Sequence, residues 1–299
     1  MCGITGIYGI PETDACAASA EALARMTKSI AHRGPDASGL WTSDEEVMLG
    51  HRRLSIIDTQ AHSNQPFIHG PSGDVIVFNG EVYNYRELRE ELKENFLFKT
   101  ESDTEVVLAA LQKWGTDALE RFNGMFAFAF WSNERRELLL ARDRMGIKPL
   151  YFAETSKGLI FSSEVRSILA SGWVDRRHDP IALADYLRYQ TVHAPRTIIE
   201  GVSMLQAGHW MRLQGEETQI AAWWNPAEES AKIDPLMPRD ERLKHIRSAM
   251  ENAVDLRMRS DVPLGAFLSG GIDSSAIVGL MKSATDQQIS TFSVTFDEG

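Results

Sequence analysis

The sequence predicts a strand-rich α+β domain with helices on its faces, followed by the start of a parallel α/β sheet. Its 299 residues suit two domains better than one. Between residues 125 and 162, four short apolar runs are separated by short polar turns, which is typical of neighbouring antiparallel strands. Nearer the other end, an apolar run, a Gly/Ser loop, a helical segment and a second apolar run form the pattern of a βαβ unit.

The elements of the first domain follow from local patterns. The apolar run that ends at Gly9 predicts a buried strand, and an Ala-rich segment after it predicts a helix capped by Asp14. Ser102 and Glu105 form a capping box that opens another helix. We expect strands at 3–9, 74–78, 125–131, 137–141, 150–153 and 159–162, helices at 14–32, 85–94, from 103 and at 180–189, a turn-rich loop at 32–36 and a hairpin at 209–222.

Composition predicts where the domains divide. Residues 225–240 combine acidic side chains with three prolines, which is typical of a linker. We therefore expect a first domain at 1–216, a linker at 217–240 and a second domain from 241 to 299. The second domain should contain a helix at 243–254, a strand at 264–268, a loop at 269–275, a helix at 276–282 and a strand at 290–296. One βαβ unit cannot cover both faces of a parallel sheet, so we expect this domain to be incomplete.

Composition also argues against several classes of protein. The net charge is −11 and no basic stripe is present, which argues against a nonspecific nucleic-acid binder. The apolar runs are too short to cross a bilayer, and the first residues lack the basic and apolar regions of a secretory leader. Cys2 and Cys16 are the only cysteines, so a disulfide framework is not expected. We expect a cytoplasmic protein without nucleic-acid or membrane partners.

Cys2 is the most informative single residue, because it directly follows the initiator methionine. Removal of Met1 would leave one residue that carries both a nucleophilic thiol and a free α-amine. The α-amine titrates at about pH 8 and can act as a general base at neutral pH. Such a residue supplies its own nucleophile and its own base for hydrolysis.

Further residues suit a cysteine hydrolase that acts on the side-chain amide of glutamine. The tetrahedral intermediate needs two hydrogen-bond donors, which the side chain of Asn79 and the backbone N–H of Gly80 can supply. Arg53 suits the substrate's carboxylate, and the acids Glu81 and Asp103 suit its ammonium group. Simpler readings stay open, since Asn-Gly is a common turn dipeptide, the arginine can be a surface charge, and an acid favours a helix start.

Several motifs occur along the chain in a set order. They are Cys2-Gly3-Ile4, His32-Arg33-Gly34-Pro35-Asp36, Arg53-Leu54-Ser55-Ile56-Ile57-Asp58, Asn79-Gly80-Glu81-Val82-Tyr83-Asn84, Glu101-Ser102-Asp103 and the segments 124–129 and 142–150. In this order they closely resemble the glutamine-hydrolysing asparagine synthetase family, whose first domain is a class II glutaminase. The resemblance implies an N-terminal nucleophile sandwich of two antiparallel sheets between helical layers. It also implies that the start of a Rossmann-like ATP-pyrophosphatase domain follows.

The resemblance assigns roles in glutamine hydrolysis. It makes Cys2 the nucleophile and its freed amine the base, and it makes Asn79 and Gly80 the oxyanion hole. The residues that it places around glutamine are Arg53 on the carboxylate, Glu81 and Asp103 on the ammonium group, and Leu54, Ile56 and Ile57 along the pocket.

The Gly/Ser segment 269–275 follows a predicted strand and opens a predicted helix, so its N–H groups converge where an anion is favoured. It lacks the lysine of a Walker A loop. It resembles the pyrophosphate loop of ATP pyrophosphatases, in which Asp273 would help to bind Mg²⁺; the simpler reading is a turn with a capping aspartate. The implied nucleotide-binding residues are Ser269, Gly270, Gly271, Asp273, Ser274 and Ser275, with Leu268 and Val294 beside the adenosine.

The family reaction activates aspartate with ATP as β-aspartyl-AMP and then transfers ammonia derived from glutamine. The resemblance therefore implies glutamine, aspartate and ATP as substrates and Mg²⁺ as a cofactor, and a homodimer is compatible with it. Two alternatives stay open. One is an amidotransferase for another carboxylate acceptor, whose binding residues would lie past residue 299. The other is a fragment with glutaminase activity only.

Overall fold

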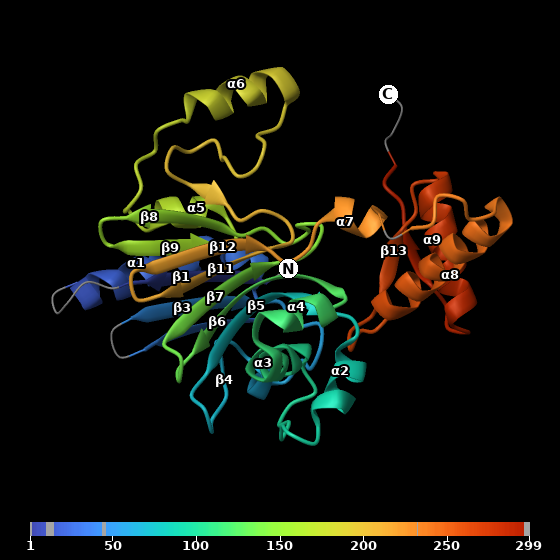
Figure 1. The fold of residues 1–299 in the computed structure, drawn as a ribbon, viewed down its shortest axis with the longest axis horizontal. Coiled ribbons are helices and arrows are strands. Elements are labelled where there is room, and N and C mark those ends of the chain that lie inside the picture. Colours follow the sequence, from blue (N-terminus) through green and yellow to red (C-terminus); the bar gives the residue numbers. More distant parts are fainter. Residues whose placement is uncertain (1, 10–14, 44–45, 232, 296–299) are drawn as a thin grey trace. The chain divides into compact units, whose positions relative to one another are not determined.

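The chain forms two compact units in the computed structural model, which describes residues 2–9, 15–43, 46–231 and 233–295 (Figure 1). The first unit ends at Asn225 and the second begins at Pro226. Strand β12 (Glu217–Ala222) lies in the segment that the sequence analysis assigned to the linker. It belongs to the first unit, because each of its residues pairs with strand β11 (His209–Gln214). The expected boundary at 216 therefore differs from this division by one strand.

The first unit contains two six-stranded sheets whose paired strands are antiparallel. The first sheet has the order β10 (Ser203–Met204), β8 (Tyr151–Thr155), β9 (Gly158–Ser162), β1 (Gly3–Tyr8), β3 (Val47–Arg53) and β2 (Ala37–Thr42). The second sheet has the order β12, β11, β7 (Glu137–Arg142), β6 (Gly124–Ser132), β5 (Val75–Val82) and β4 (Phe67–Ile68).

Helices cover the outer face of each sheet (Figure 1). Residues of α1 and α5 share a buried apolar cluster with the first sheet, and residues of α2, α3 and α4 share one with the second sheet. A third cluster, which includes Ile4, Val77 and Trp131, fills the space between the sheets. The predicted sandwich of two antiparallel sheets between helical layers is confirmed. The helices of this unit are α1 (Ala15–Ser29), α2 (Tyr85–Leu92), α3 (Asp103–Trp114), α4 (Ala118–Arg121), α5 (Val165–Ala170) and α6 (Pro180–Tyr189).

Two strands differ from the sequence-based expectation in ways that matter for function. β5 does not end at residue 78: it continues through Asn79 and Gly80, because β6 offers a partner for each residue from Val75 to Val82. The Asn-Gly dipeptide is therefore in a strand and not in a turn. β3 was not expected, because three of its seven residues are His or Arg, yet six of the seven are buried. The cap assigned to Asp14 lies outside the described residues.

The second unit contains one parallel strand pair together with helices. β13 (Gly265–Phe267) and β14 (Ser290–Phe292) are parallel and are joined through α9 (Ile272–Ala284), which confirms the predicted βαβ unit. α7 (Pro226–Ala231) forms inside the expected linker, and α8 (Arg239–Arg257) follows it. Helix α9 begins four residues earlier than expected, so its first turn contains part of the Gly/Ser loop. Among the described residues, none of the helices combines the length and apolar character needed to cross a membrane.

Candidate active site

Cys2 directly precedes β1, whose six residues are all buried and which lies between β3 and β9 in the sheet. Three hydrogen bonds hold the cysteine in place, and in one of them its Sγ donates to the Leu54 carbonyl at 3.5 Å. The backbone N–H of Leu54 donates to Sγ at 3.4 Å, and Nε of Arg33 donates to the Cys2 carbonyl at 2.8 Å. The fixed strand and these donors leave the sulfur facing a cavity of about 330 Å³.

This cavity brings together every first-domain residue that the sequence analysis assigned to glutamine or its hydrolysis. Strands β3 and β5, helix α3 and the loop after β3 each contribute to its lining. The predicted residues that line it are Cys2, Arg53, Leu54, Ile56, Ile57, Asn79, Gly80, Glu81 and Asp103. They are separated by up to a hundred positions in sequence and meet only because the sheets stack.

Asn79 has an unusual environment for a polar residue. Its side chain is fully buried, yet neither Oδ1 nor Nδ2 has a hydrogen-bond partner in the described chain. Buried polar side chains are nearly always hydrogen-bonded, and an orphaned amide costs free energy. An unpaired amide that lines a cavity is well suited to a ligand.

The next residue, Gly80, lies where strands β5 and β6 approach closely. A Cβ atom at Gly80 would lie 2.3 Å from the backbone oxygen of Met125, and one at Gly124 would lie 2.3 Å from the oxygen of Glu81. Both distances are far below van der Waals contact. Glycine is required at both positions, and the cavity is correspondingly open at Gly80.

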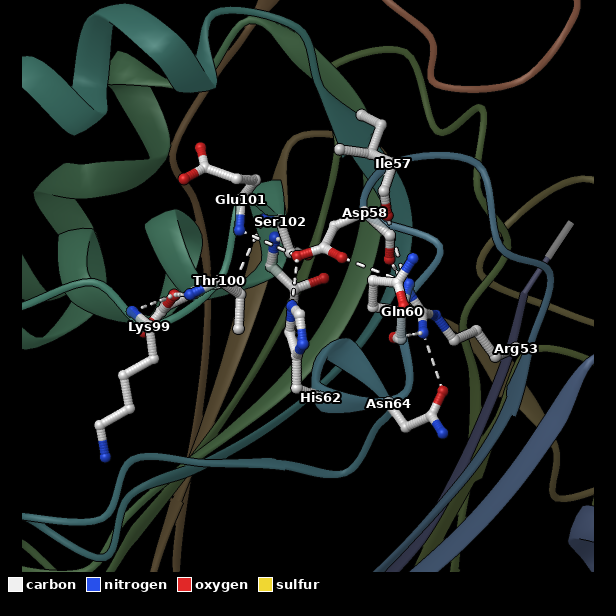
Figure 2. Close-up of polar contacts among 12 residues, drawn as sticks. Arg53, Ile57, Asp58, Gln60, His62, Asn64, Lys99, Thr100, Glu101 and Ser102 are labelled. Carbon is white, nitrogen blue, oxygen red and sulfur yellow. Dashed lines mark hydrogen bonds and ion pairs between the residues drawn. The ribbon is translucent and has the colours of Figure 1, made fainter.

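Arg53 holds the loop that follows β3 (Figure 2). Its Nη1 donates to the carbonyl of Gln60 at 2.9 Å and to Oδ1 of Asn64 at 2.8 Å. Its Nη2 donates to the carbonyls of Ile57 and Asp58. Both terminal nitrogens are thus bonded to protein acceptors, so this arginine shapes the cavity as well as lining it. Arg53 is not the surface charge of the simpler reading, because it is 4% exposed.

Asp58 connects that loop to the segment before α3 (Figure 2). Its carboxylate accepts the N–H of Glu101 at 2.9 Å and lies 3.0 Å from Nε2 of His62. Burial raises the pKa of Asp58, but hydrogen bonds, among them those from Glu101 and His62, outweigh it and keep that pKa below its usual value. The anion therefore clamps two walls of the cavity together.

Helix α3 is started by Ser102, whose Oγ accepts the N–H of Thr104 at 3.1 Å. The expected capping box is only half formed. Glu105 does not reach back to the Ser102 N–H, because its carboxylate accepts both the N–H and the hydroxyl of Thr100 at 2.7 Å. The cap places Asp103 in the first turn, at the edge of the cavity.

The acids of the cavity are electrostatically strained without a bound cation. Burial, together with the neighbouring Glu81, raises the pKa of Asp103 to about 7, although the Val82 N–H bonds its Oδ2 at 3.1 Å. Burial also raises the pKa of the Cys2 thiol, and Asp103 adds to this, whereas the Leu54 N–H and Arg53 lower it. A cationic group bound between the two acids would relieve their repulsion.

Seven further residues line the cavity without having been assigned to it from the sequence: Gln65, Phe78, Ser102, Thr104, Met125, Ile147 and Lys148. Ile147 and Lys148 come from the segment 142–150, which was quoted as a motif but given no role. The signal that could have identified them was this unassigned motif. A lysine in a turn is usually solvated, so its pattern alone does not indicate burial.

The predicted nucleotide residues lie in the second unit. Leu268 follows β13 and its N–H donates to the carbonyl of Phe292 at 2.8 Å, while Val294 follows β14 and is largely exposed. Asp273, Ser274 and Ser275 lie in the first turn of α9, not in a loop. The predicted residues of the loop and of this first turn are Ser269, Gly270, Gly271, Asp273, Ser274 and Ser275. The hydroxyls of Ser269 and Ser274 lie 3.1 Å apart.

This loop suits a phosphate anion, because it precedes a thirteen-residue helix and adds hydroxyl donors. Asp273 is the one carboxylate in it, and Mg²⁺ is commonly held by one or two carboxylates together with phosphates. Among the described residues, no three His, Cys, Asp or Glu side chains are grouped as a protein metal site would require.

Comparison with known protein families identifies the family to which the chain belongs. Residues 1–224 match the model of the glutamine amidotransferase domain. The chain belongs to the glutamine amidotransferase domain family. Residues 245–299 match a second model, described as asparagine synthase. The amidotransferase match covers the first unit almost completely, β12 included.

Relatives of this amidotransferase chain are longer than it is. It is 38% identical to asparagine synthetase [glutamine-hydrolyzing] 1 of Bacillus subtilis, over all of this chain and 46% of the relative. It is 35% identical to amidase chry2 of Gibberella zeae, over 93% of this chain and 43% of the relative. The chain thus spans about half the length of these curated relatives.

Among solved structures, the glutamine phosphoribosylpyrophosphate amidotransferase of B. subtilis has the same fold. It aligns with a TM-score of 0.56 and 17% identity, over 97% of this chain and 65% of that structure. At this identity the likeness concerns the fold alone.

Proposed function

We propose that the first unit hydrolyses the side-chain amide of glutamine to glutamate and ammonia, with Cys2 as the nucleophile. The observation that carries this proposal is the cavity itself. It places the Cys2 sulfur, an unpaired buried amide at Asn79 and two acids of one wall around a volume of about 330 Å³. This volume suits one amino-acid molecule.

The reaction follows from these groups. The Cys2 thiol gives its proton to the α-amine that removal of Met1 frees, and the sulfur attacks the carbonyl carbon of the amide. The oxyanion of the tetrahedral intermediate takes hydrogen bonds from Nδ2 of Asn79 and the N–H of Gly80. The amine then returns the proton to the leaving nitrogen, which departs as ammonia and leaves a thioester on Cys2. Water hydrolyses this thioester to glutamate.

The remaining residues bind the substrate. Asp103 and Glu81 take the α-ammonium group, whose charge offsets their mutual repulsion. Arg53 takes the α-carboxylate. Since its terminal nitrogens hold the loop after β3, glutamine binding would require the carboxylate to share or replace one of those acceptors. Leu54, Ile56 and Ile57 line the methylene chain.

This chain spans about half the length of its curated relatives. For a protein that also contains the other half, we propose glutamine-dependent asparagine synthesis. ATP would activate the aspartate side chain, and the ammonia would displace AMP. The loop 269–275 would hold the pyrophosphate portion of ATP, with Asp273 on Mg²⁺ and with Leu268 and Val294 beside the adenosine. The match of residues 245–299 to the asparagine synthase model supports this proposal. A cytoplasmic location and a homodimer stay predictions.

A second candidate is amide transfer to another carboxylate acceptor. It stays a candidate because not every relative is named an asparagine synthetase: one is named an amidase. Both candidates use ammonia released from glutamine, so they share the chemistry proposed for the first unit.

The direct test is glutamate and ammonia release by the purified chain, with Cys2→Ala as the matched variant. We expect hydrolysis by the parent and none by the variant, and we expect intact mass to show that Met1 has been removed. Hydrolysis by Cys2→Ala, or full activity with Met1 retained, would overturn the proposed nucleophile or base. Cys16→Ser is the control, because Cys16 is exposed on α1 and should not matter.

A further inference from the structure

The turn between β7 and β8 is held by two charged residues at its start. The Asp143 carboxylate accepts backbone N–H groups of Met145, Ile147, Lys148 and Phe126 at 3.0–3.1 Å. Arg142 donates to the carbonyls of Lys148, Leu205 and Gly146 at 2.6–2.7 Å. Hydrogen bonds therefore hold both the N–H groups and the carbonyls of this turn. The Cα positions from which its side chains extend are fixed as a result.

The turn places Lys148 in the wall of the Cys2 cavity. Lys148 is 4% exposed, and it lines the cavity together with Cys2, Asn79 and Glu81. Lysine is almost never this buried unless it is paired. Within the described residues, however, its ammonium group makes no ion pair with a carboxylate. A cavity wall with an unpaired ammonium group faces whatever negative charge the cavity develops.

Two negative groups of the cavity act on Lys148: the Glu81 carboxylate and the ionised Cys2 sulfur. Burial lowers the pKa of Lys148, Glu81 and the Cys2 sulfur raise it, Arg33 lowers it, and Asp143 raises it. Around the Cys2 sulfur, Asp103 raises the pKa of the thiol and Arg53 lowers it. Because the thiol is buried, its ionisation needs compensation by nearby positive charge.

We propose that Lys148 is a further residue of the Cys2 site, whose ammonium group stabilises the thiolate form of Cys2 and so the nucleophile itself. The proposal rests on the nucleophilic role of Cys2 stated above. It gives the segment 142–150 a purpose, because Asp143 and Arg142 then act as positioning residues that hold the lysine in the cavity wall.

The test measures Cys2 without using glutamine. In a Cys16→Ser background, Cys2 is the one remaining thiol, and its rate of alkylation by iodoacetamide is followed from pH 5 to pH 10. An opposite charge close to an ionisable group shifts its pKa by about 1 to 3 units. For Lys148→Met we therefore expect the midpoint of the profile to rise by at least about one unit, which lowers the rate at pH 7 about tenfold. The limiting rate at high pH should not change.

Matched variants separate charge from structure. Lys148→Gln should shift the midpoint as Lys148→Met does, and Lys148→Arg should restore the parent profile. Lys28→Met removes an exposed lysine of α1 and should leave the profile unchanged. A purely structural role of Lys148 would change the limiting rate and not the midpoint.

The outcome decides the proposal whatever the chain's substrate is. A Lys148→Met profile that superimposes on that of the Cys16→Ser parent overturns the role of Lys148, even if glutamine hydrolysis is found. A shifted profile in a chain that does not hydrolyse glutamine supports the role of Lys148 and overturns the proposed function instead.

Discussion

The buried amide of Asn79 separates catalysis from stability at the scale of one residue. For Asn79→Ala we expect kcat for glutamine to fall about 10²–10³-fold, because one oxyanion donor is lost. We expect no loss of thermal stability, because the amide has no hydrogen bond to lose. Steady-state kinetics and thermal unfolding of the same sample check both halves. A normal kcat would remove Asn79 from the oxyanion hole.

Asp103 gives the site a dependence on pH. Its carboxyl must be ionised to bind an ammonium group, and burial with Glu81 nearby raises its pKa to about 7. The KM for glutamine should therefore rise as the pH falls below about 7, by about tenfold per unit once the carboxyl is mostly protonated. The pH profile of KM tests this, and Asp103→Asn should have a high KM that lacks this dependence.

The same pKa has the opposite consequence for folding. Because the folded value is raised from 3.8, the folded chain holds a proton that the unfolded chain releases, so Asp103 favours folding at low pH and this contribution is lost as the pH rises through 7. Asp103→Asn should raise the melting temperature at pH 8 more than at pH 5. Equal shifts at the two values would contradict the assigned pKa.

At the scale of elements, the cap of α3 couples stability to substrate binding. Ser102→Ala removes the bond from Oγ to the Thr104 N–H and should cost about 1 kcal/mol in urea unfolding. It should also raise the KM for glutamine, because Asp103 sits in the loosened turn. Asp179 caps α6 away from the cavity and is the matched control. Asp179→Ala should lower stability and leave KM unchanged.

The elements also explain what the sequence could and could not predict. Long apolar runs such as those of β6 and β7 were found within a residue or two, because burial of both strand faces makes their composition distinctive. β3 was missed because the buried His51 and Arg53, and Arg52 between them, are charged residue types that indicate a surface position. The nine residues assigned to binding or hydrolysing glutamine were selected from the order of motifs along the chain, not from hydrophobic periodicity. The motif 142–150 indicates that Lys148 matters, but it does not predict the burial of Lys148, because that burial depends on the backbone hydrogen bonds to Asp143.

At the scale of the whole molecule, the important feature is the boundary between the two units. Each residue assigned to glutamine hydrolysis lies before residue 225, so a chain that ends at Asn225 should keep the kcat/KM of the full chain within about threefold. A chain that ends at residue 216 lacks β12 and exposes the edge of β11 along its length. We expect it to aggregate.

Size-exclusion chromatography and glutaminase assays of the two truncated chains check this prediction. Equal behaviour of both would mean that β12 is dispensable and that the expected boundary at 216 was adequate.

The second unit should behave differently. Phe267, Phe292 and Val294 are 80%, 58% and 73% exposed, so the 299-residue chain should bind an apolar dye that the chain ending at Asn225 does not bind. It should hydrolyse glutamine and form no asparagine from ATP and aspartate, because the one strand pair of the second unit is only part of the covered parallel sheet that such a domain needs. Detection of asparagine or AMP would contradict this expectation.

The close approach of β5 and β6 also limits which mutations this cavity can accept during evolution. Every missense codon reachable from glycine by a single nucleotide change adds a Cβ atom, and at Gly80 and Gly124 that atom collides with the opposite backbone. In a library that randomises each codon, folded clones should retain glycine at both positions. New substrate preferences would then have to arise on the facing walls, where Ile56 and Ile147 line the same space with replaceable side chains.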